Sequence, residues 1–561
     1  MKTQSFTAVI ICAFVLFTVR PGSAGAPISV WAVDALLKVF PDDAPGTNRA
    51  ADRTWLIPRN GHASVQFAVR SNTAIPELTV SLTLGGGLQT EVRRVGYVPV
   101  RANVPDTPPD ELARTAPGRF PDPLFEEDRF TLPANETTAV WISVYAPPQT
   151  TPDVYNGEAV LRAGQERVGN IKFKIKVVSA TVPATQALKV SNWFYFDEPT
   201  MSPYFDVKDK PEKLWELLGN IARVMADYKQ NVFLTPVLAL TDARVNGDKL
   251  EYDFSRFDRF VDTVTRAGAM QLIEGSHLIE RAGGYDGPLK IPGFVADGGE
   301  VKRQQLDPDD PSARAHLQSF LPALYAHLKE KGWLQRYVQH VLDEPHGKEP
   351  PVYLRYVPIV RRNLPGVPTI DAFDQESGGW LGDACNIKVP QLGKFDNAMD
   401  VVRQHIKAGG EAWYYTCLYP RGRYPNRFID YPLLKTRLLH WLNYRYALTG
   451  YLHWGGDSWG KNPFEITELG LDVGAPTKDA LPAGDAFITY PWREKNSIYS
   501  SIRLEAMREG IEDYELLNAL AMTNPNKAMK LAQKVMPTFT EYVRDVRSFR
   551  KLHVELLAAA P

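Results

Sequence analysis

Three consecutive stretches decide the fold: NVFLTPVLAL (231–240), SRFDRFVDTVTRAG (255–268) and MQLIEGSHL (270–278). The first and the third are apolar runs of strand length. The second has apolar residues three and four positions apart, as on one face of a helix. A strand, a helix and another strand in this order are typical of parallel strands joined by a crossover helix. These stretches therefore predict one β-α-β unit.

The same alternation continues on both sides of this unit. Six further apolar runs have strand length: LKVSNWF (188–194), RYVQHVLDEP (336–345), PTIDAFD (368–374), NIKVP (386–390), EAWYYTCLYP (411–420) and GYLHWGGDSW (450–459). Eight such units, separated by stretches of helical periodicity, predict a (β/α)8 TIM barrel, in which catalytic groups stand at the C-terminal ends of the strands. We expect this barrel to span residues 184–520 and a C-terminal helical extension to span residues 521–561.

The chain before the barrel has a different pattern. From about Ile28 to Val178 apolar residues alternate with polar ones, as in SVQFAVRS, AVWISVYA and VGNIKFKIKVVS, and Gly, Pro and Asn separate these runs. Such alternation is typical of strands with one buried face. We expect residues 27–183 to form an antiparallel β-sandwich, so that the protein is multidomain.

The N-terminal segment predicts export. Lys2 precedes the apolar run FTAVIICAFVLFTV, and small residues follow in PGSAGA (21–26), as in a secretory signal peptide. We expect residues 1–26 to be removed and the mature protein to be secreted or periplasmic. The run is shorter than the roughly 20 residues needed to span a bilayer, and no later segment is a candidate membrane span. Cys385 and Cys417 are then the remaining thiols, either paired or buried and free.

Composition and charge narrow the set of partners. The chain has 64 Lys and Arg residues against 65 Asp and Glu residues, a formal net charge of −1, and the two signs are interspersed. Neither nucleic acid nor an anionic membrane is therefore an implied partner. The sequence contains no metal-ligand spacing, no P-loop, no dinucleotide-binding glycine fingerprint and no GxSxG motif. We expect no metal and no cofactor, and the oligomeric state is not indicated.

Asp343 and Glu344, in HVLDEPHG (340–347), form the candidate catalytic pair. Neighbouring residues within a strand point to opposite faces, so both side chains can enter a cleft only where the strand ends, and Pro345 marks that end. A solvated acidic loop is the alternative interpretation. The same tripeptide at Asp197-Glu198-Pro199 follows the first strand at some distance, and there we favour a rim or structural role.

The seventh predicted strand lacks a carboxylate where one is expected. Many retaining glycosidase barrels place a nucleophilic carboxylate about 5 Å from the acid. In EAWYYTCLYP the only acid, Glu411, lies at the N-terminal end, and the outgoing end offers Tyr414 and Tyr415. The reaction can still proceed if a 2-acetamido group of the substrate attacks its own anomeric carbon. Asp343 would then orient the acetamido group, Glu344 would protonate the leaving oxygen, and one of the two tyrosines would hold the acetamido oxygen.

Several other residues near strand ends are candidates for contacts with a glycan substrate. Flat indole rings can stack on the apolar face of a pyranose, and polar side chains can bind its hydroxyls. Each aromatic residue taken singly is more often part of a core than of a sugar-binding surface. Each polar residue is likewise more often structural than substrate-binding. Besides the two tyrosines, the candidates are Trp193, Asn192, His277, Asp371, Trp454, Trp459 and Arg503.

The motifs together resemble a known family. LDEP, WYYTCLYP, GYLHWGGDSW, GDAFITYPW and SIRLEAMREGIEDYELL are similar to the catalytic domain of glycoside hydrolase family 123, and the N-terminal region is similar to the domain that precedes it. The resemblance covers nearly all of the chain after residue 26, and the last motif is the most specific. It implies a retaining exo-β-N-acetylgalactosaminidase that works by substrate assistance. Asp343 would be the acetamido-orienting residue and Glu344 the acid/base.

Two alternatives remain open at this point. One is a glycosidase for neutral or furanose sugars, which in an inverting form would have Glu344 as the acid and Asp371 or Asp374 as the base. Inverting carboxyl pairs stand roughly 6.5 to 9.5 Å apart to admit a water molecule. The other is a carbohydrate-binding barrel without catalytic activity.

Overall fold

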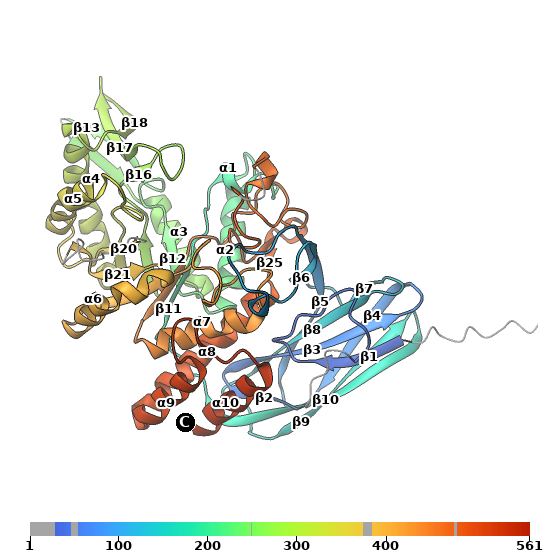
Figure 1. The fold of residues 1–561 in the computed structure, drawn as a ribbon. Coiled ribbons are helices and arrows are strands. Elements are labelled where there is room, and N and C mark those ends of the chain that lie inside the picture. Colours follow the sequence, from blue (N-terminus) through green and yellow to red (C-terminus); the bar gives the residue numbers. More distant parts are fainter. Residues whose placement is uncertain (1–27, 47–53, 248, 374–383, 476–478) are drawn as a thin grey trace, which may run out of the picture.

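The computed structural model describes residues 28–46, 54–247, 249–373, 384–475 and 479–561. The predicted signal peptide and Asp374 lie outside these ranges. Within the described ranges, no helix is both long and apolar enough to cross a membrane. Figure 1 shows a strand-rich N-terminal part beside a larger part in which strands and helices alternate.

The N-terminal part consists of two five-stranded sheets. The first has the strand order β1 (Ile28–Val33), β3 (Gly61–Ser71), β8 (Thr137–Ala146), β5 (Gln89–Val100), β6 (Gly118–Phe125), and the second β2 (Thr54–Arg59), β10 (Glu166–Thr181), β9 (Val154–Ala163), β4 (Ile75–Leu84), β7 (Arg129–Leu132). Apolar side chains of both sheets share one core, as do Phe67 and Ile142 of the first sheet and Leu161 and Ile175 of the second. The alternating pattern in the sequence is thus the inward face of each strand.

One pair of strands departs from the predicted antiparallel arrangement. β2 lies parallel to β10, with Thr54 opposite Lys174 and Ile57 opposite Val177. The chain leaves β2 through Asn60, whose backbone is left-handed (φ 54°), and enters β3 of the other sheet. Asn tolerates this conformation better than most residues. Alternation of apolar residues identifies the buried face of a strand but not its direction, so the sequence could not reveal this pairing.

Each of the eight strand ranges predicted after residue 184 contains a strand. They are β11 (Lys189–Asn192), β12 (Val232–Thr235), β15 (Leu272–Gly275), β19 (Tyr337–Gln339), β20 (Ile370–Phe373), β21 (Ile387–Pro390), β22 (Glu411–Tyr415) and β23 (Gly450–His453). Parallel pairing joins β12 to β15 and β19, and joins β20 through β21, β22 and β23 to β11. A parallel bridge between Gln339 and Thr369 links the two groups. Most of these strand residues are buried, which explains why their runs are continuously apolar.

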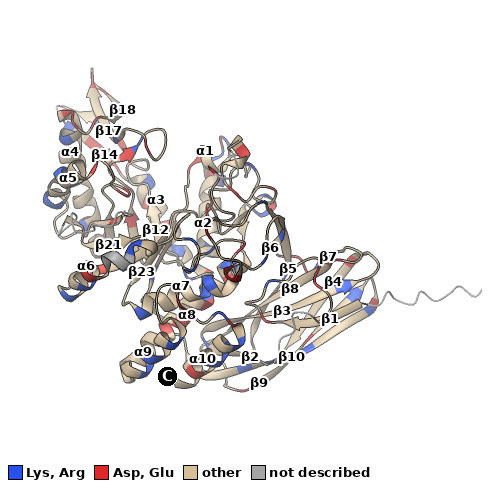
Figure 2. Cartoon of the chain, viewed as in Figure 1, with Lys and Arg blue, Asp and Glu red and all other residues tan. Residues whose placement is uncertain are grey.

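Helices connect most of these strands. They are α2 (Pro211–Asp227), α3 (Ser255–Ala267), α4 (Pro311–Glu330), α5 (Pro350–Asn363), α6 (Phe395–Lys407), α7 (Leu433–Arg445) and α8 (Ile502–Thr523). In α3 the buried residues Phe257, Phe260, Val261 and Val264 recur at helical spacing, and Gly268, in a left-handed conformation, ends the helix. The helices α2, α3, α4 and α5 bury one face each, and charged residues of both signs lie on the outside of this part of the chain (Figure 2), whereas α7 and most of α8 are buried on all sides, charged residues included.

Two insertions follow strands at their C-terminal ends. A hairpin of β13 (Asp242–Asn246) and β14 (Lys249–Asp253) follows β12, and a small sheet of β16 (Glu280–Arg281), β17 (Leu289–Asp297) and β18 (Glu300–Leu306) follows β15. The second insertion lies between the third and the fourth of the predicted strands. Both insertions therefore extend the end of the strands at which the candidate acid pair stands.

Two helices follow α8, namely α9 (Pro525–Val535) and α10 (Val546–Ala559). α10 lies against the N-terminal sheets, where Thr181 donates its backbone N–H to the carbonyl of Pro561 at 2.9 Å. A short helical C-terminal tail is therefore present, and it packs on the strand-rich part. Cys385 and Cys417 are both buried and free.

Candidate active site

Asp343 and Glu344 follow β19 after a short connection, residues 340–342, and Pro345 comes after them. The strand ends at Gln339, earlier than predicted, but a bridge between Ile279 and Leu342 continues the parallel arrangement. The backbone of Glu344 is left-handed (φ 39°), a conformation that costs a non-glycine residue on the order of 1–3 kcal/mol and persists only where the surroundings hold it. Both side chains are partly exposed. This turn places two adjacent, partly exposed carboxylates directly after a buried segment.

Arg281 of β16 holds the main chain of this turn. Its guanidinium donates to the carbonyl oxygens of Asp343 (2.9 Å) and Glu344 (3.0 Å), and it is paired with the carboxylate of Glu349 (2.6 Å). Burial opposes the charge of Arg281, but the contact with Glu349 outweighs it and raises the pKa of the guanidinium. The insertion after β15 thus braces the candidate pair from outside.

The two tyrosines of β22 point to opposite sides. The hydroxyl of Tyr415 donates to Oε1 of Glu344, whereas that of Tyr414 donates to the carbonyl of Leu439 in α7 at 2.7 Å. Burial and the neighbouring charge of Glu344 raise the pKa of Tyr415 well above its usual value, so it is a neutral donor at physiological pH. Strand alternation allowed only one of the two to face the site, and the structure identifies it as Tyr415.

A buried charge network lies beneath the pair. His340 contacts Oε1 of Glu274 through Nε2 (2.8 Å) and Oδ1 of Asp371 through Nδ1 (3.3 Å). Asp371 also accepts the backbone N–H groups of Val341 (2.9 Å) and Leu342 (3.2 Å), directly before the pair. Burial disfavours charge on His340, but the two carboxylates outweigh it and raise its pKa to about 10. One imidazolium therefore joins β15 to β20 and fixes the end of β19.

The other end of this network holds an indole ring. Glu274 accepts a hydrogen bond from Nε1 of Trp193 (3.0 Å) and another from Ser191 (2.6 Å). The Trp193 ring packs edge-on against His277, 5.4 Å between centroids. Trp193 is thus oriented by buried polar groups and not only by apolar packing.

His277 lies beside Asp343. Its Nε2 is 4.0 Å from Oδ1 of Asp343 and has no hydrogen-bond partner among the described residues. Burial lowers the pKa of His277 well below its usual value, and the charges of His340 and Arg281 act in the same direction. His277 is therefore a neutral imidazole with one ring nitrogen near the candidate pair.

Ligand atoms of His277, His340 and Asp371 lie within 4.8 Å of one another, close enough to hold a metal ion. Both ring nitrogens of His340, however, are engaged with Glu274 and Asp371. The arrangement is therefore better described as a hydrogen-bonded network than as a metal centre.

Other candidates from the sequence lie inside the protein. Asn192 is 1% exposed and bonded to Gln230 and Arg427, and Trp459 is 2% exposed with Nε1 bonded to the carbonyl of Thr489. Their positions near strand ends suggested sugar contacts, but both have their polar groups satisfied by protein. Trp454, after β23, is partly exposed and stays a candidate.

Arg503 is also buried, on the first turn of α8. It forms a two-bond ion pair with Asp122 of β6 (2.8 Å each) and donates to the carbonyls of Arg427, Gly484 and Phe487. No surface of Arg503 is exposed. The expected contact with substrate is therefore not supported, and the residue instead joins α8 to the N-terminal sheet.

Asp197 and Glu198 stand where a rim or structural role was expected. Asp197 caps the short helix α1 (Glu198–Met201), accepting the backbone N–H of Thr200 at 2.7 Å. The tripeptide that resembles the candidate pair thus begins a helix.

A pocket of about 620 Å³ opens next to Asp343. It lies between the segment after β11, the connection from β12 to β13 and the hairpin of β17 and β18, and Trp193, Tyr195 and His277 line it together with Asp343. Volumes of about 300–1,000 Å³ are usual for small-molecule sites. Figure 1 shows the two insertions, with β13, β16, β17 and β18, close together at the upper left.

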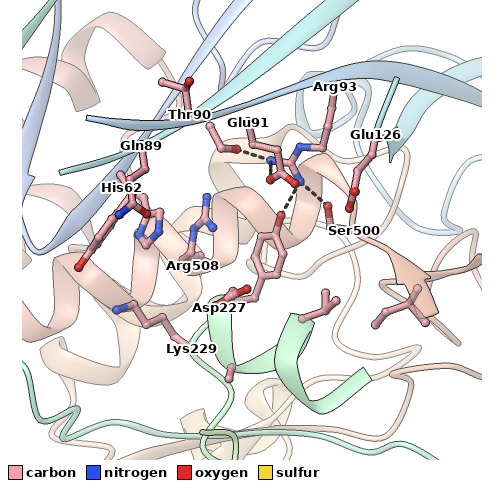
Figure 3. Close-up of a pocket in the computed structure, with 16 residues that line it drawn as sticks. His62, Gln89, Thr90, Glu91, Arg93, Glu126, Asp227, Lys229, Ser500 and Arg508 are labelled. Carbon is pink, nitrogen blue, oxygen red and sulfur yellow. Dashed lines mark hydrogen bonds and ion pairs between the residues drawn. The ribbon is translucent and has the colours of Figure 1, made fainter. Parts of the chain in front are cut away.

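A second pocket, of about 550 Å³, lies at the junction of β5, α2 and α8 (Figure 3). Arg93 crosses it, donating to Tyr228 and Ser500 (2.7 Å each) and pairing with Glu505 of α8. The dashed contacts in Figure 3 run across the junction of the two parts of the chain. The candidate acid pair does not line this pocket. The buried charges at the pocket join the N-terminal sheet to α8.

Sequence reasoning missed four residues near the site: Glu274, His340, Arg281 and Tyr195. Glu274 and His340 interrupt the apolar runs MQLIEGSHL and RYVQHVLDEP. A charged or ionisable residue inside a buried strand needs a partner, so these interruptions were an available signal. Arg281 and Tyr195 lie in connections, where no periodicity identifies them.

Comparisons with known proteins were made against families, curated sequences and solved structures. A family model described as "Glycoside hydrolase 123, catalytic domain" matches residues 193–520. No curated protein sequence matches. A family 123 glycoside hydrolase from Clostridium perfringens, whose structural report concerns glycolipid glycan hydrolysis, matches with a TM-score of 0.72 and 16% identity over 95% of this chain and 97% of that chain. A family 39 glycoside hydrolase from Bacteroides cellulosilyticus WH2 matches with a TM-score of 0.36 and 11% identity, covering 82% of each chain.

The family match covers more than half of the 561 residues and includes the strands that carry the candidate pair. The likeness to the Clostridium perfringens enzyme extends the shared fold to the N-terminal sheets. This chain therefore belongs to glycoside hydrolase family 123 and is a glycosidase.

Proposed function

We propose that this glycosidase is a retaining exo-β-N-acetylgalactosaminidase in which the 2-acetamido group of the substrate is the nucleophile. The observation that carries the proposal is the contact between Tyr415 and Glu344. A tyrosine hydroxyl stands at the end of β22, where many retaining barrels have a nucleophilic carboxylate. Asp343 and Glu344 leave β19 next to it, so the site combines an acid, a second carboxylate and a neutral donor.

The roles follow from the chemistry of an oxazoline intermediate. Asp343 accepts the acetamido N–H, which orients the group and stabilises the positive charge that develops on it. The acetamido oxygen attacks the anomeric carbon while Glu344 donates its proton to the leaving oxygen. A water molecule then attacks the same carbon with Glu344 as the base, and the product keeps the β configuration.

In this proposal the hydroxyl of Tyr415 has one hydrogen-bond partner in the free enzyme and another when substrate is bound. In the free enzyme its hydroxyl donates to Glu344, and a hydrogen bond to a carboxylate favours the ionised form. When substrate binds, the same hydroxyl turns to the acetamido oxygen. Glu344 then loses a donor and holds its proton more firmly, as a general acid requires.

The proposal includes a closed (β/α)8 barrel as the frame of the site. Parallel pairing or a bridge links seven of the eight steps around the strands. At the remaining step Asn231, next to β12, donates its backbone N–H to the carbonyl of Val190 in β11 (3.4 Å). We keep residues 27–183, 184–520 and 521–561 as the proposed domains of the mature protein.

Export and a glycoconjugate substrate belong to the same proposal. The signal peptide predicted over residues 1–26 would make the enzyme secreted or periplasmic. A relative of known structure is reported in connection with glycolipid glycans, and galactosamine is a common sugar of such conjugates. As the sugar we propose GalNAc before GlcNAc.

The inverting alternative finds less support. Asp371 has no exposed surface, and both of its carboxyl oxygens accept hydrogen bonds, from Val341 and Tyr353 among others. A general base must reach the water that it activates, and Asp371 reaches only protein. Asp374, the other candidate base, lies outside the described residues.

A panel of aryl β-glycosides with and without the 2-acetamido group tests the proposal. Turnover is expected for the 2-acetamido galactoside, and Glu344→Gln should lower kcat by about 10²–10⁴, the usual worth of a general acid. Glu198→Gln is the matched control, because it changes the same residue of the second Asp-Glu-Pro tripeptide, at the start of α1. Unchanged activity in Glu344→Gln, or preference for substrates without the amide, would refute the proposal.

A further inference from the structure

The pocket of about 620 Å³ lies to one side of the candidate pair. Asp343 lines it, whereas Glu344 and Tyr415 do not. Its inner part is apolar, with Phe194, Leu238 and Phe294 each less than a tenth exposed. It is much larger than the methyl group of an acetamido substituent would require.

The walls of this pocket are fixed to one another. Arg303 of β18 donates to the carbonyls of Leu238 (2.9 Å) and Thr241, and its guanidinium lies over the ring of Phe294, 4.7 Å from the centroid. The hairpin is thereby clamped to the connection after β12. A cavity held open in this way does not have to be formed when a ligand binds, which lowers the entropic cost of binding.

The geometry of an amide shows which substrate group faces the pocket. In a trans amide the N–H and the acyl carbon chain lie on the same side of the C–N bond, and the carbonyl oxygen lies on the other. If Asp343 accepts the amide N–H, the acyl chain must point past Asp343 into the pocket. The carbonyl oxygen then points away from it, toward the side on which Tyr415 and Glu344 stand.

We infer that this pocket binds the acyl chain of the substrate amide, and that the enzyme also accepts 2-acylamido hexosides whose acyl group is longer than acetyl. The inference rests on the proposed function, since it takes Asp343 as the acceptor of the amide N–H. Apolar walls suit an alkyl chain. Gln304 and Gln305, which also line the pocket, provide a polar outer end.

The test uses aryl 2-acylamido-2-deoxy-β-galactosides with acetyl, propanoyl and butanoyl groups. Lengthening the alkyl chain hardly changes the basicity of the carbonyl oxygen, so differences in rate report on fit. kcat/KM should rise about fourfold for each methylene group that becomes buried. Equal or falling values along the series would overturn the inference.

A variant that partly fills the pocket provides the second part of the test. Ala239 is exposed and lines the pocket, so Ala239→Trp should shorten it without disturbing the core. The variant should lose the gain in kcat/KM of the butanoyl compound over the acetyl compound. Ala296→Trp, at an exposed position of β17 that does not line the pocket, is the matched control. A butanoyl gain that persists in Ala239→Trp would show that the chain lies elsewhere and would refute the inference.

The two proposals fail in different ways. Turnover of the acetyl compound that depends on Glu344, together with a flat series, refutes the acyl pocket and leaves the proposed function intact. Absence of turnover for all three compounds refutes both.

Discussion

The contact between Tyr415 and Glu344 predicts that removal of the Tyr415 hydroxyl group shifts the pH profile of kcat/KM. Tyr415→Phe removes a neutral donor from a carboxylate. A hydrogen bond to a charged group is worth about 1.5–3 kcal/mol, and one pKa unit corresponds to about 1.4 kcal/mol. Loss of a donor to the ionised form makes the carboxyl hold its proton to higher pH, by roughly 1–2 pH units on these figures.

The assay is kcat/KM as a function of pH, which reports groups of the free enzyme. Glu344 must be protonated to act as the acid, so activity falls on the basic limb. In Tyr415→Phe this limb should move upward by roughly 1–2 pH units, even though activity at the optimum also falls. The matched control is Tyr414→Phe, the adjacent residue of the same strand, whose hydroxyl donates to the carbonyl of Leu439 in α7. An unmoved basic limb in Tyr415→Phe, or an equal movement in Tyr414→Phe, would refute the reasoning.

Two further predictions concern the buried charges. Asp371→Asn keeps an oxygen for the backbone N–H groups but removes one partner of His340, so we expect at most an about tenfold loss of kcat, against the 10²–10⁴ of a true general base. The pKa of His340 in the folded protein, about 10, exceeds its usual value of 6.5. The stabilisation that this shift contributes is therefore fully present below pH 6.5 and is lost as the pH rises through 10. In thermal unfolding, the loss of stability caused by Asp371→Asn should become smaller in that direction, and a loss that stays constant with pH would contradict this. Asp122→Asn leaves Arg503 buried without its ion partner and should lower the unfolding free energy by about 3–5 kcal/mol, whereas Glu136→Gln, which breaks an exposed pair with Arg119, should change it by less than about 1 kcal/mol; equal effects would argue against the structural role of Arg503.

The sequence predicted much of the frame of this site. Periodicity identified the eight parallel strands after residue 184, because a buried parallel strand is a short apolar run and a surface helix repeats its apolar face every three or four residues. The sequence also led to Asp343 and Glu344, since Pro345 marks the end of the predicted strand, although β19 itself ends at Gln339. The direction of the strands in the N-terminal sheets could not be predicted, because alternation of apolar residues does not distinguish a parallel strand at a sheet edge, such as β2, from an antiparallel one.

Individual side chains at the site were predicted less well, for a physical reason. A residue near a strand end can face the cleft, the core or a neighbouring domain, and the choice depends on partners that are distant in sequence. Arg503 is bonded to Asp122, 381 positions away, and Asn192 to Arg427, 235 positions away. Tyr415 was recoverable as one of two adjacent residues, because alternation within a strand is a local rule.

The central claim, that the acetamido oxygen of the substrate is the nucleophile, is tested most directly by changing that oxygen alone. Aryl 2-deoxy-β-galactosides with acetamido, fluoroacetamido, difluoroacetamido and trifluoroacetamido groups keep the leaving group and nearly the size of the amide while fluorine withdraws electrons from the carbonyl. Measured kcat/KM should fall steadily with each added fluorine if the acetamido oxygen attacks the anomeric carbon. A series with no such dependence would contradict substrate assistance and return the reaction to a nucleophile that the enzyme or water supplies.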